Sequence, residues 1–248
     1  VQTHQCQPGR VVMGPYPLAF QSAGFFHAHL RAWWESQFNT MLQPGHRFRY
    51  DNILSGNLSI EAEIFARIGG FDPAIRSAGG EDYELGIRLI KAGVGIAVAA
   101  NALAYHHDSS DLHRSCLRKR QEGRADVLMA RRHPDIVQVL RLAQYESSGI
   151  SLRRILRKLA FCCSIVGDML AAFLGRGLNL FERMRLRSDW RRILAVLQHY
   201  WYWRGVAEEL GSVQALRDLL RNGSTIPVNA GPRIELDLCE GLEAAKQR

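Results

Sequence analysis

Two hydrophobic patterns alternate along the first 110 residues: short apolar runs, and longer segments whose apolar positions recur every three or four residues. The apolar runs predict short strands at residues 10–14, 94–99 and 103–106. The longer segments predict helices at 19–42 and 59–68, and a third from Glu81 that carries Tyr83, Ile87 and Ile90 on one face. Strands that alternate with helices indicate an α/β domain.

The remainder of the chain has a helical pattern throughout. The periodicity predicts helices at 111–133, 151–174 and 189–210, separated by Pro134, by Gly149 and by a turn at 175–177. Residues 222–248 contain Gly, Pro and acidic residues without clear periodicity, so we expect a loose tail there.

Turn residues mark the boundaries of the front elements. Ser59 is expected to cap the helix that runs to Ile68, and Gly69 and Gly70 are expected to end it. Residues 55–59 form a polar turn, and Gly93 ends the helix that begins near Glu81.

Charge changes this picture in the middle of the chain. With 248 residues, 47% hydrophobic and 23% charged, the sequence is typical of a globular protein with a sizeable core. Residues 114–192 hold 18 Lys/Arg and 7 Asp/Glu, a local net charge of +11. Such a zone attracts phosphate groups of nucleic acid, anionic lipid or diphosphate-linked substrates, or it is simply a solvated helix surface.

One apolar stretch within this basic zone has two interpretations. Residues 159–174 are interrupted by Asp168 and fall short of the roughly 18 apolar residues of a spanning helix. Basic residues precede the stretch, a pattern that suits a helix lying in a membrane interface. Packing against the protein's own core explains the same pattern.

The five cysteines are odd in number and lack a C-x-x-C pair, which favours neither disulfides nor a zinc site and fits a reducing compartment.

The most informative motifs lie between Gly56 and His107. They are, in order, Gly-Asn-Leu-Ser at 56–59, Ile-Gly-Gly-Phe-Asp at 68–72, Gly-Gly-Glu-Asp-Tyr-Glu-Leu-Gly-Ile-Arg at 79–88, and Ala-Tyr-His-His at 104–107. This order resembles the second half of the catalytic domain of family 2 glycosyltransferases over residues 10–135. The resemblance implies a fold class of α/β, a partial GT-A (Rossmann-like) domain followed by a mainly α-helical region. The corresponding domains are the acceptor side at 1–135, a basic helical extension at 136–221 and the tail at 222–248.

The Glu81-Asp82 pair is the candidate catalytic centre. Inverting glycosyl transfer needs a base that takes the proton of an acceptor hydroxyl as its oxygen attacks the anomeric carbon. At a helix start, backbone N–H groups and the helix dipole hold a carboxylate and its negative charge in place. The resemblance assigns Asp82 as the base and Glu81 as a residue that orients the acceptor. Acidic residues are also common at helix starts without any catalytic role.

Other candidates surround this pair. A divalent cation, Mg or Mn, is expected from the resemblance to neutralise the leaving diphosphate, with His106 as the proposed metal ligand and His107 as the alternate. Gly79 and Gly80 would let substrate approach the backbone closely. Substrate-binding residues are further expected at Asn57, Ser59, Trp33 and Trp34, although turn chemistry explains the first two and core packing the two tryptophans.

Two departures from the family limit the inference. Processive members carry Gln-x-x-Arg-Trp, whereas this chain has Ala125 after Arg124, so a processive synthase is disfavoured while Arg124 is kept as a contact to the donor diphosphate. The Asp-x-Asp motif of the family's first half does not occur. We therefore expect the chain to begin after that motif and the isolated fragment to be inactive.

The sequence thus predicts a glycosyltransferase that moves a sugar from a nucleotide-sugar donor to a glycan, lipid-linked or protein acceptor. Cell-surface polysaccharide, glycolipid or glycoprotein synthesis is the expected process. The expected location is cytoplasmic and peripheral, with an anionic membrane surface at the inner face as a further partner. Two alternatives remain open: a non-catalytic scaffold for membrane docking or oligomerisation, which includes an aromatic interface at residues 200–203, and a basic nucleic-acid-binding helical module, for which no motif is present.

Overall fold

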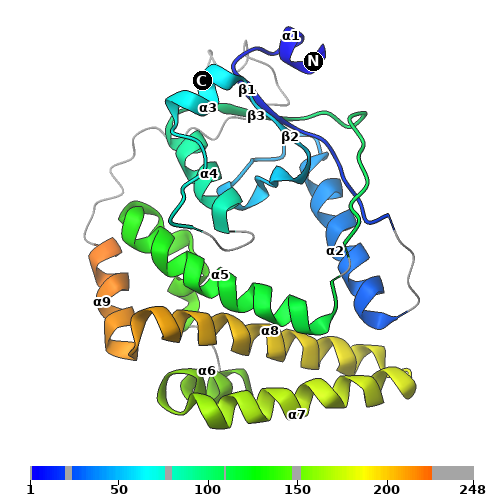
Figure 1. Cartoon of the computed structure of the whole chain (residues 1–248), viewed down its shortest axis with the longest axis vertical. Coiled ribbons are helices and arrows are strands. Elements are labelled where there is room, and N and C mark those ends of the chain that lie inside the picture. Colours follow the sequence, from blue (N-terminus) through cyan, green and yellow to red (C-terminus); the bar gives the residue numbers. More distant parts are fainter. Residues whose placement is uncertain (1, 20–23, 76–79, 109, 147–151, 225–248) are drawn as a thin grey trace. The chain divides into compact units, whose positions relative to one another are not determined.

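The computed structural model describes residues 2–19, 24–75, 80–108, 110–146 and 152–224. The chain divides into two compact units (Figure 1). The first, called the sheet unit, contains described residues of 1–74 and 81–109, and the second, called the helical unit, contains those of 75–80 and 110–231.

The sheet unit is built on three short strands. Strand β1 (Arg10–Met13) lies in the middle, parallel to β3 (Gly95–Val98) and antiparallel to β2 (Leu58–Ser59). In this register Arg10 pairs with Gly95, and Val12 pairs with Ser59. The β1 strand is buried along its whole length, as expected for an apolar central strand.

Helices cover this sheet and provide most of the unit's core. They are α1 (Gln2–Cys6), α2 (Phe25–Met41), α3 (Ala62–Arg67) and α4 (Gly80–Lys91), with 3-10 turns η1 (Tyr50–Asn52) and η2 (Ser55–Asn57). Val11 of β1 packs with residues of α3 and α4, whereas Met13 packs with a cluster from α2 and the η1–η2 region. The sheet is therefore small, and helix packing holds most of the unit together.

An arginine clamp fixes α4 to the end of α3. Arg88 donates from Nε to the buried Glu84 carboxylate at 2.8 Å and from Nη2 to the Gly70 carbonyl at 2.6 Å. Its Nη1 donates to the Ile68 carbonyl. Gly69 and Gly70 both adopt positive φ angles, 85° and 65°, which ends α3 as the sequence predicts. The clamp thus satisfies carbonyls that the end of α3 leaves without helical partners.

The helical unit is layered around α8 (Arg187–Leu210). Helix α5 (Leu112–Arg132) packs on α8, as do α6 (Leu152–Cys162) and α7 (Ser164–Arg183), while α9 (Val213–Ser224) packs on the 3-10 segment η3 (Pro134–Val139). A further 3-10 segment, η4, spans Arg141–Tyr145. Figure 1 shows α8 with α5 on one side and α7 on the other.

Close backbone contact and buried aromatic side chains join these layers. A Cβ on Gly205 would lie 1.9 Å from the Arg120 carbonyl oxygen, so α5 and α8 touch where only glycine fits. Tyr202 is fully buried and donates to Asp126 of α5 at 2.5 Å, while the buried Tyr200 donates to Asp168 of α7 at 2.5 Å. Trp203 is also buried. Three of the four side chains of the predicted aromatic interface at residues 200–203 are therefore buried inside the unit, and Trp201 is half-buried.

Several other boundaries differ from the sequence-based predictions. Ser59 lies in β2 and does not cap α3, whose N-cap is Glu61. The helix predicted at 151–174 is broken at Cys163, and the expected turn at 175–177 lies inside α7. Residues 222–224 complete α9, while the rest of the predicted tail lies outside the described residues. Among the described helices, none is both long and apolar enough to cross a bilayer.

Candidate functional site

The carboxyl ends of the parallel strands β1 and β3 lie side by side and continue together. Ala99 donates to the Met13 carbonyl at 2.8 Å, and beyond the strands Ala104 donates to the Pro15 carbonyl at 3.0 Å. His106 then donates to the Pro17 carbonyl at 2.9 Å. The strand predicted at 103–106 is therefore an irregular continuation with one isolated bridge, between Leu18 and His106. In open α/β sheets ligands bind outside the carboxyl ends of the strands, which directs attention to this edge.

Asn57 holds this edge together through its side chain. Its Nδ2 donates to the Ala102 carbonyl at 2.7 Å and its backbone carbonyl accepts from Gly14 at 2.9 Å. The crossing is tight, because a Cβ on Gly14 would lie 2.1 Å from the Ala102 carbonyl oxygen. Asn57 thus links the segment after β1 to the segment after β3. A substrate contact by Asn57 stays a prediction.

Asp82 lies in the first turn of α4 and faces the η2 turn. Its Oδ2 accepts a hydrogen bond from the Ser55 backbone N–H at 3.3 Å. Its Oδ1 is buried and has no hydrogen-bond partner among the described residues. The Ser55 backbone N–H thus positions one carboxylate oxygen, while the other receives no hydrogen bond from the described residues. Glu81 precedes it and is half-buried.

Tyr16 is the buried neighbour of this carboxylate. It is 6% exposed, and its hydroxyl oxygen accepts from the Gly56 backbone N–H. A Cβ on Gly56 would lie 2.6 Å from the Tyr16 ring, so the turn and the ring are in close contact. Burial raises the pKa of Tyr16 strongly, and the negative charge of Asp82 adds to that rise. The phenol therefore remains neutral at physiological pH and braces the turn that holds Asp82.

His106 belongs to the same cluster. Its ring centroid lies 5.8 Å from that of Tyr16 and 5.5 Å from that of Trp34. The His106 Nε2 atom is 3.7 Å from Oδ2 of Asp108, whose side chain is only 4% exposed. His107, the alternate, is exposed. The ring that packs on Tyr16 and Trp34 thus belongs to His106, the first of the two histidines proposed as metal ligands; that role stays a prediction.

The fit of a divalent cation can be tested on this pair. Two ligands of one ion at bond lengths of roughly 2.1 Å lie at most ~4.2 Å apart, so the 3.7 Å separation between His106 Nε2 and Asp108 Oδ2 is compatible with a shared cation. No group of three His, Cys, Asp or Glu side chains gathers in the part of the chain that the structure describes. The distance between the two atoms is thus compatible with a shared ion, while the described residues supply no complete ligand set.

The remaining predicted residues lie in several environments. Trp34 is buried against Tyr16 and Phe38, whereas Trp33 is 40% exposed on α2. Ser59 is exposed, and its Oγ lies 2.9 Å from Nε2 of His4. Gly79 lies outside the described residues.

Gly80 and Arg124 belong to the helical unit. Gly80 begins α4, and a Cβ placed there would lie 2.5 Å from that of Ala125. Arg124 donates to Glu208 at 2.5 Å. Its proposed contact with the donor diphosphate stays a prediction.

Sequence reasoning missed Tyr16, Ser55 and Asp108. The available signal was Gly-Pro-Tyr directly after the first apolar strand, because the carboxyl end of a parallel strand is a common place for site residues. Ser55 contacts Asp82 through its backbone N–H, a group that any residue except proline carries, so the residue type does not predict this contact. Asp108 follows His106 by two positions and could have been proposed as its partner.

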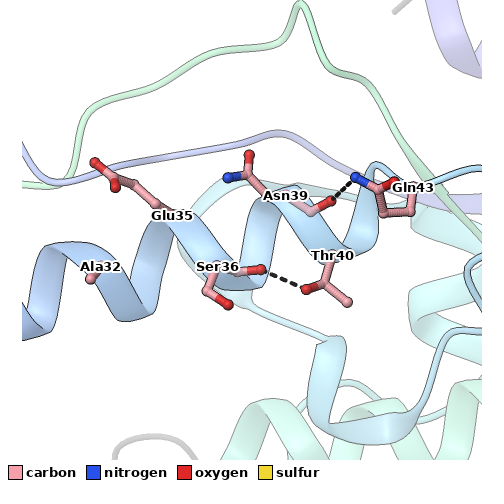
Figure 2. Close-up of a pocket in the computed structure, with 6 residues that line it drawn as sticks. All are labelled: Ala32, Glu35, Ser36, Asn39, Thr40 and Gln43. Atoms are coloured by element: carbon pink, nitrogen blue, oxygen red, sulfur yellow. Dashed lines mark hydrogen bonds between the residues drawn. The ribbon is translucent and has the colours of Figure 1, made fainter.

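A separate hollow lies along the polar face of α2 (Figure 2), lined by Ala32, Glu35, Ser36, Asn39, Thr40 and Gln43. Thr40 donates to the Ser36 carbonyl at 2.7 Å, and Gln43 donates to the Asn39 carbonyl at 3.2 Å. These bonds are local to one helix and satisfy its own carbonyls. The hollow contains none of the clustered residues described above.

Comparison with known protein families places part of the chain. Residues 36–109 match the family model described as the N-terminal domain of galactosyltransferase. This range includes Ser55, Asp82, His106 and Asp108, and excludes Tyr16. No curated protein and no solved structure matches the chain. The match supports a glycosyltransferase domain, without being specific to family 2 or to the GT-A fold. Domains of this kind use a nucleotide-sugar donor and an acceptor, and often a divalent metal.

Proposed function

We propose that the chain forms the acceptor side of an inverting glycosyltransferase with a GT-A fold, related to family 2, in which Asp82 is the general base. The observation that carries the proposal is the asymmetry of the Asp82 carboxylate. Ser55 N–H holds Oδ2 at 3.3 Å, whereas the buried Oδ1 has no partner among the described residues. The match to a galactosyltransferase domain covers this residue, which favours a catalytic role over that of an ordinary acidic residue at a helix start.

The chemistry follows from this arrangement. The acceptor hydroxyl would give its proton to the Asp82 carboxylate while its oxygen forms a bond to the anomeric carbon of the donor sugar. The bond from that carbon to the diphosphate oxygen breaks, and the nucleoside diphosphate leaves with the electron pair. Attack opposite to the leaving group inverts the anomeric configuration. The Ser55 N–H keeps the carboxylate oriented throughout.

Tyr16 supports this step indirectly. Its neutral hydroxyl accepts from Gly56 N–H, and its ring lies against that glycine. Tyr16 therefore stabilises the turn whose Ser55 N–H donates to Asp82. We assign Tyr16 as a positioning residue of the base.

His106 and Asp108 would hold the divalent cation. When bound, the cation would neutralise charge that develops on the departing diphosphate. The packing of the His106 ring on Tyr16 and Trp34 would fix its orientation toward the ion. The proposed donor is a nucleotide sugar, and the name of the matched family makes UDP-galactose the first donor to test.

The test compares two acidic residues that both occupy the first turn of a helix. The full-length protein is assayed for release of nucleoside diphosphate from UDP-galactose in the presence and absence of candidate acceptors. Asp82→Asn is expected to lower kcat by roughly 10²–10⁴-fold, because the reaction loses its base. Glu63→Gln, at an exposed position in the first turn of α3, is expected to leave kcat unchanged. Wild-type turnover in Asp82→Asn, with an unchanged unfolding transition, would falsify the assignment.

A further inference from the structure

A row of large apolar side chains runs along α7 in an exposed position. Ile165, Met169, Phe173, Leu180 and Met184 are between 57% and 74% exposed. Successive members are four, four, seven and four residues apart, which places them on one face of the helix and just beyond its end. Single exposed apolar residues are ordinary, but a continuous row marks an interaction site. We call these five side chains the α7 row.

The opposite face of α7 is the one that attaches it to the helical unit. Gly167, Ala171 and Leu178 are buried, and a Cβ on Gly167 would lie 2.6 Å from the Tyr200 hydroxyl of α8. These residues are four and seven apart, and they fall on the side of the helix away from the α7 row. The row therefore has no role in attaching α7 to α8, and its exposure follows from how α7 is docked.

The segment that carries the row also exposes basic residues. Arg176, Arg183 and Arg185 are exposed along and just after the helix, and the neighbouring α6 exposes Arg153 and Lys158. Residues 152–187 contain eight Lys/Arg and two Asp/Glu, which gives this segment a net charge of +6. One of the two acidic residues, Asp168, accepts from Tyr200 inside the unit. At 100° per residue, Arg176 and Arg183 fall on the same face of α7 as the row, so this face is both apolar and positively charged.

This combination selects one kind of occupant. A second copy of the chain would bring a segment of the same +6 charge against this face, which opposes self-association through it. Nucleic acid would pair with the arginines and leave the exposed Phe173 and Met169 in water. The interface of an anionic bilayer accepts apolar side chains at the headgroup boundary and attracts Lys and Arg at the same time.

We propose that the α7 row inserts into the interface of an anionic lipid bilayer, with the arginines of the same segment against its headgroups. Apolar burial supplies affinity and the basic residues supply selectivity for anionic lipid. The proposal concerns the helical unit alone and does not depend on the transferase activity proposed for the sheet unit.

The test is flotation of the chain with vesicles of pure phosphatidylcholine and with vesicles of phosphatidylcholine and phosphatidylglycerol at 7:3. Wild type is expected to float with the mixed vesicles and weakly or not at all with the neutral ones. Met169→Glu with Phe173→Glu is expected to weaken binding at least tenfold. Arg176→Gln with Arg183→Gln is expected to weaken it by roughly 25-fold, about fivefold for each charge removed.

Val139→Glu is the matched control. Val139 lies in η3 of the same unit and is 57% exposed, so the substitution places one glutamate at a comparably exposed apolar position outside the α7 row. Binding by this variant should equal that of wild type. All variants change exposed side chains, and their far-UV circular dichroism is expected to match that of wild type.

Three outcomes would overturn the proposal. The first is a wild-type chain that does not float with mixed vesicles. The second is flotation that is insensitive to Met169→Glu with Phe173→Glu, or equal on neutral and anionic vesicles. The third is a dimer in sedimentation velocity that these two glutamates dissociate, since a second copy of the chain would then cover the α7 row.

Discussion

Replacing Gly205 by alanine tests the close contact between helices α5 and α8. Gly205 of α8 lies against α5, where its Cβ would be 1.9 Å from the Arg120 carbonyl oxygen. The reciprocal contact is as tight, because a Cβ on Gly123 of α5 would lie 2.0 Å from the Tyr202 carbonyl oxygen. In both cases the opposing atom belongs to backbone, so no side-chain rotation can relieve the clash. The two helices must separate by about 1 Å or more before an alanine fits.

The expected loss of stability follows from what that separation breaks. Overpacking alone costs about 1–3 kcal/mol. Moving α8 from α5 also stretches the hydrogen bond from Tyr202 to Asp126, now 2.5 Å, and that from Arg124 to Glu208, also 2.5 Å. We expect Gly205→Ala to lower the free energy of unfolding of the helical unit by about 3 kcal/mol. At roughly 4–8 °C per kcal/mol for a small domain, its Tm falls by more than about 10 °C.

Gly175→Ala is the control, because the same substitution there should have the opposite effect. Gly175 lies inside α7, and nothing stands within 4 Å of a Cβ placed on it. Alanine is the better helix former by roughly 0.5–1 kcal/mol, so this variant is expected to unfold a few degrees above wild type. Thermal and urea unfolding followed by circular dichroism at 222 nm measure both. The reasoning is refuted if Gly205→Ala unfolds like wild type, or if both variants shift in the same direction by similar amounts.

Three further predictions concern charged groups. Burial raises the pKa of Asp126 to about 7, so between pH 4 and 6.5 this aspartate makes stability fall as pH rises. Burial and nearby arginines lower the pKa of His199 to about 4, so over the same range this histidine makes stability rise with pH. Urea unfolding across this range should therefore show stability rising with pH in Asp126→Asn and falling with pH in His199→Gln; parallel profiles would contradict both shifts. Glu208→Gln removes the partner of three arginines and should lower the free energy of unfolding by about 1–3 kcal/mol in urea, whereas Glu209→Gln next to it should have little effect. Arg88→Lys keeps the charge but loses the planar fork that reaches Glu84 and the end of α3, so a loss of about 2 kcal/mol is expected in the sheet unit; an unchanged urea midpoint would argue against the clamp.

Much of the fold followed from periodicity and from glycine. The strand at β1, the helix that begins near Glu81 and the stop at Gly69 and Gly70 are where the pattern predicts them, because local signals and tertiary packing agree there. Gly175 misled the prediction, since a glycine inside an exposed helix and a glycine in a turn look alike in sequence. The break at Cys163 carries no breaker residue and depends on how α6 and α7 each dock on α8.

The candidate site was predictable in part. Asp82 and His106 were proposed from motifs, and the structure places both near Tyr16. The contact that orients Asp82 comes from the backbone N–H of Ser55, 27 residues away. A backbone donor cannot be predicted from residue type. Arg124 was assigned to the donor from its partial match to the Gln-x-x-Arg-Trp motif, whereas its guanidinium is paired with Glu208, 84 residues further on. Pairings of such separation are fixed by topology, which composition and spacing do not reveal.

The central position of α8 has a consequence during synthesis on the ribosome. Helix α5 leaves the ribosome long before α8 does, since Arg120 and its partner Glu208 are 88 residues apart. At about 5–20 residues per second, the face of α5 that receives α8 waits roughly 4–18 s for its partner. Until then Gly123 and Asp126 lack the α8 residues that they contact in the folded unit. The nascent helical unit is therefore a natural client for ribosome-associated chaperones, and ribosomes stalled before residue 187 should display α5 in a protease-sensitive state.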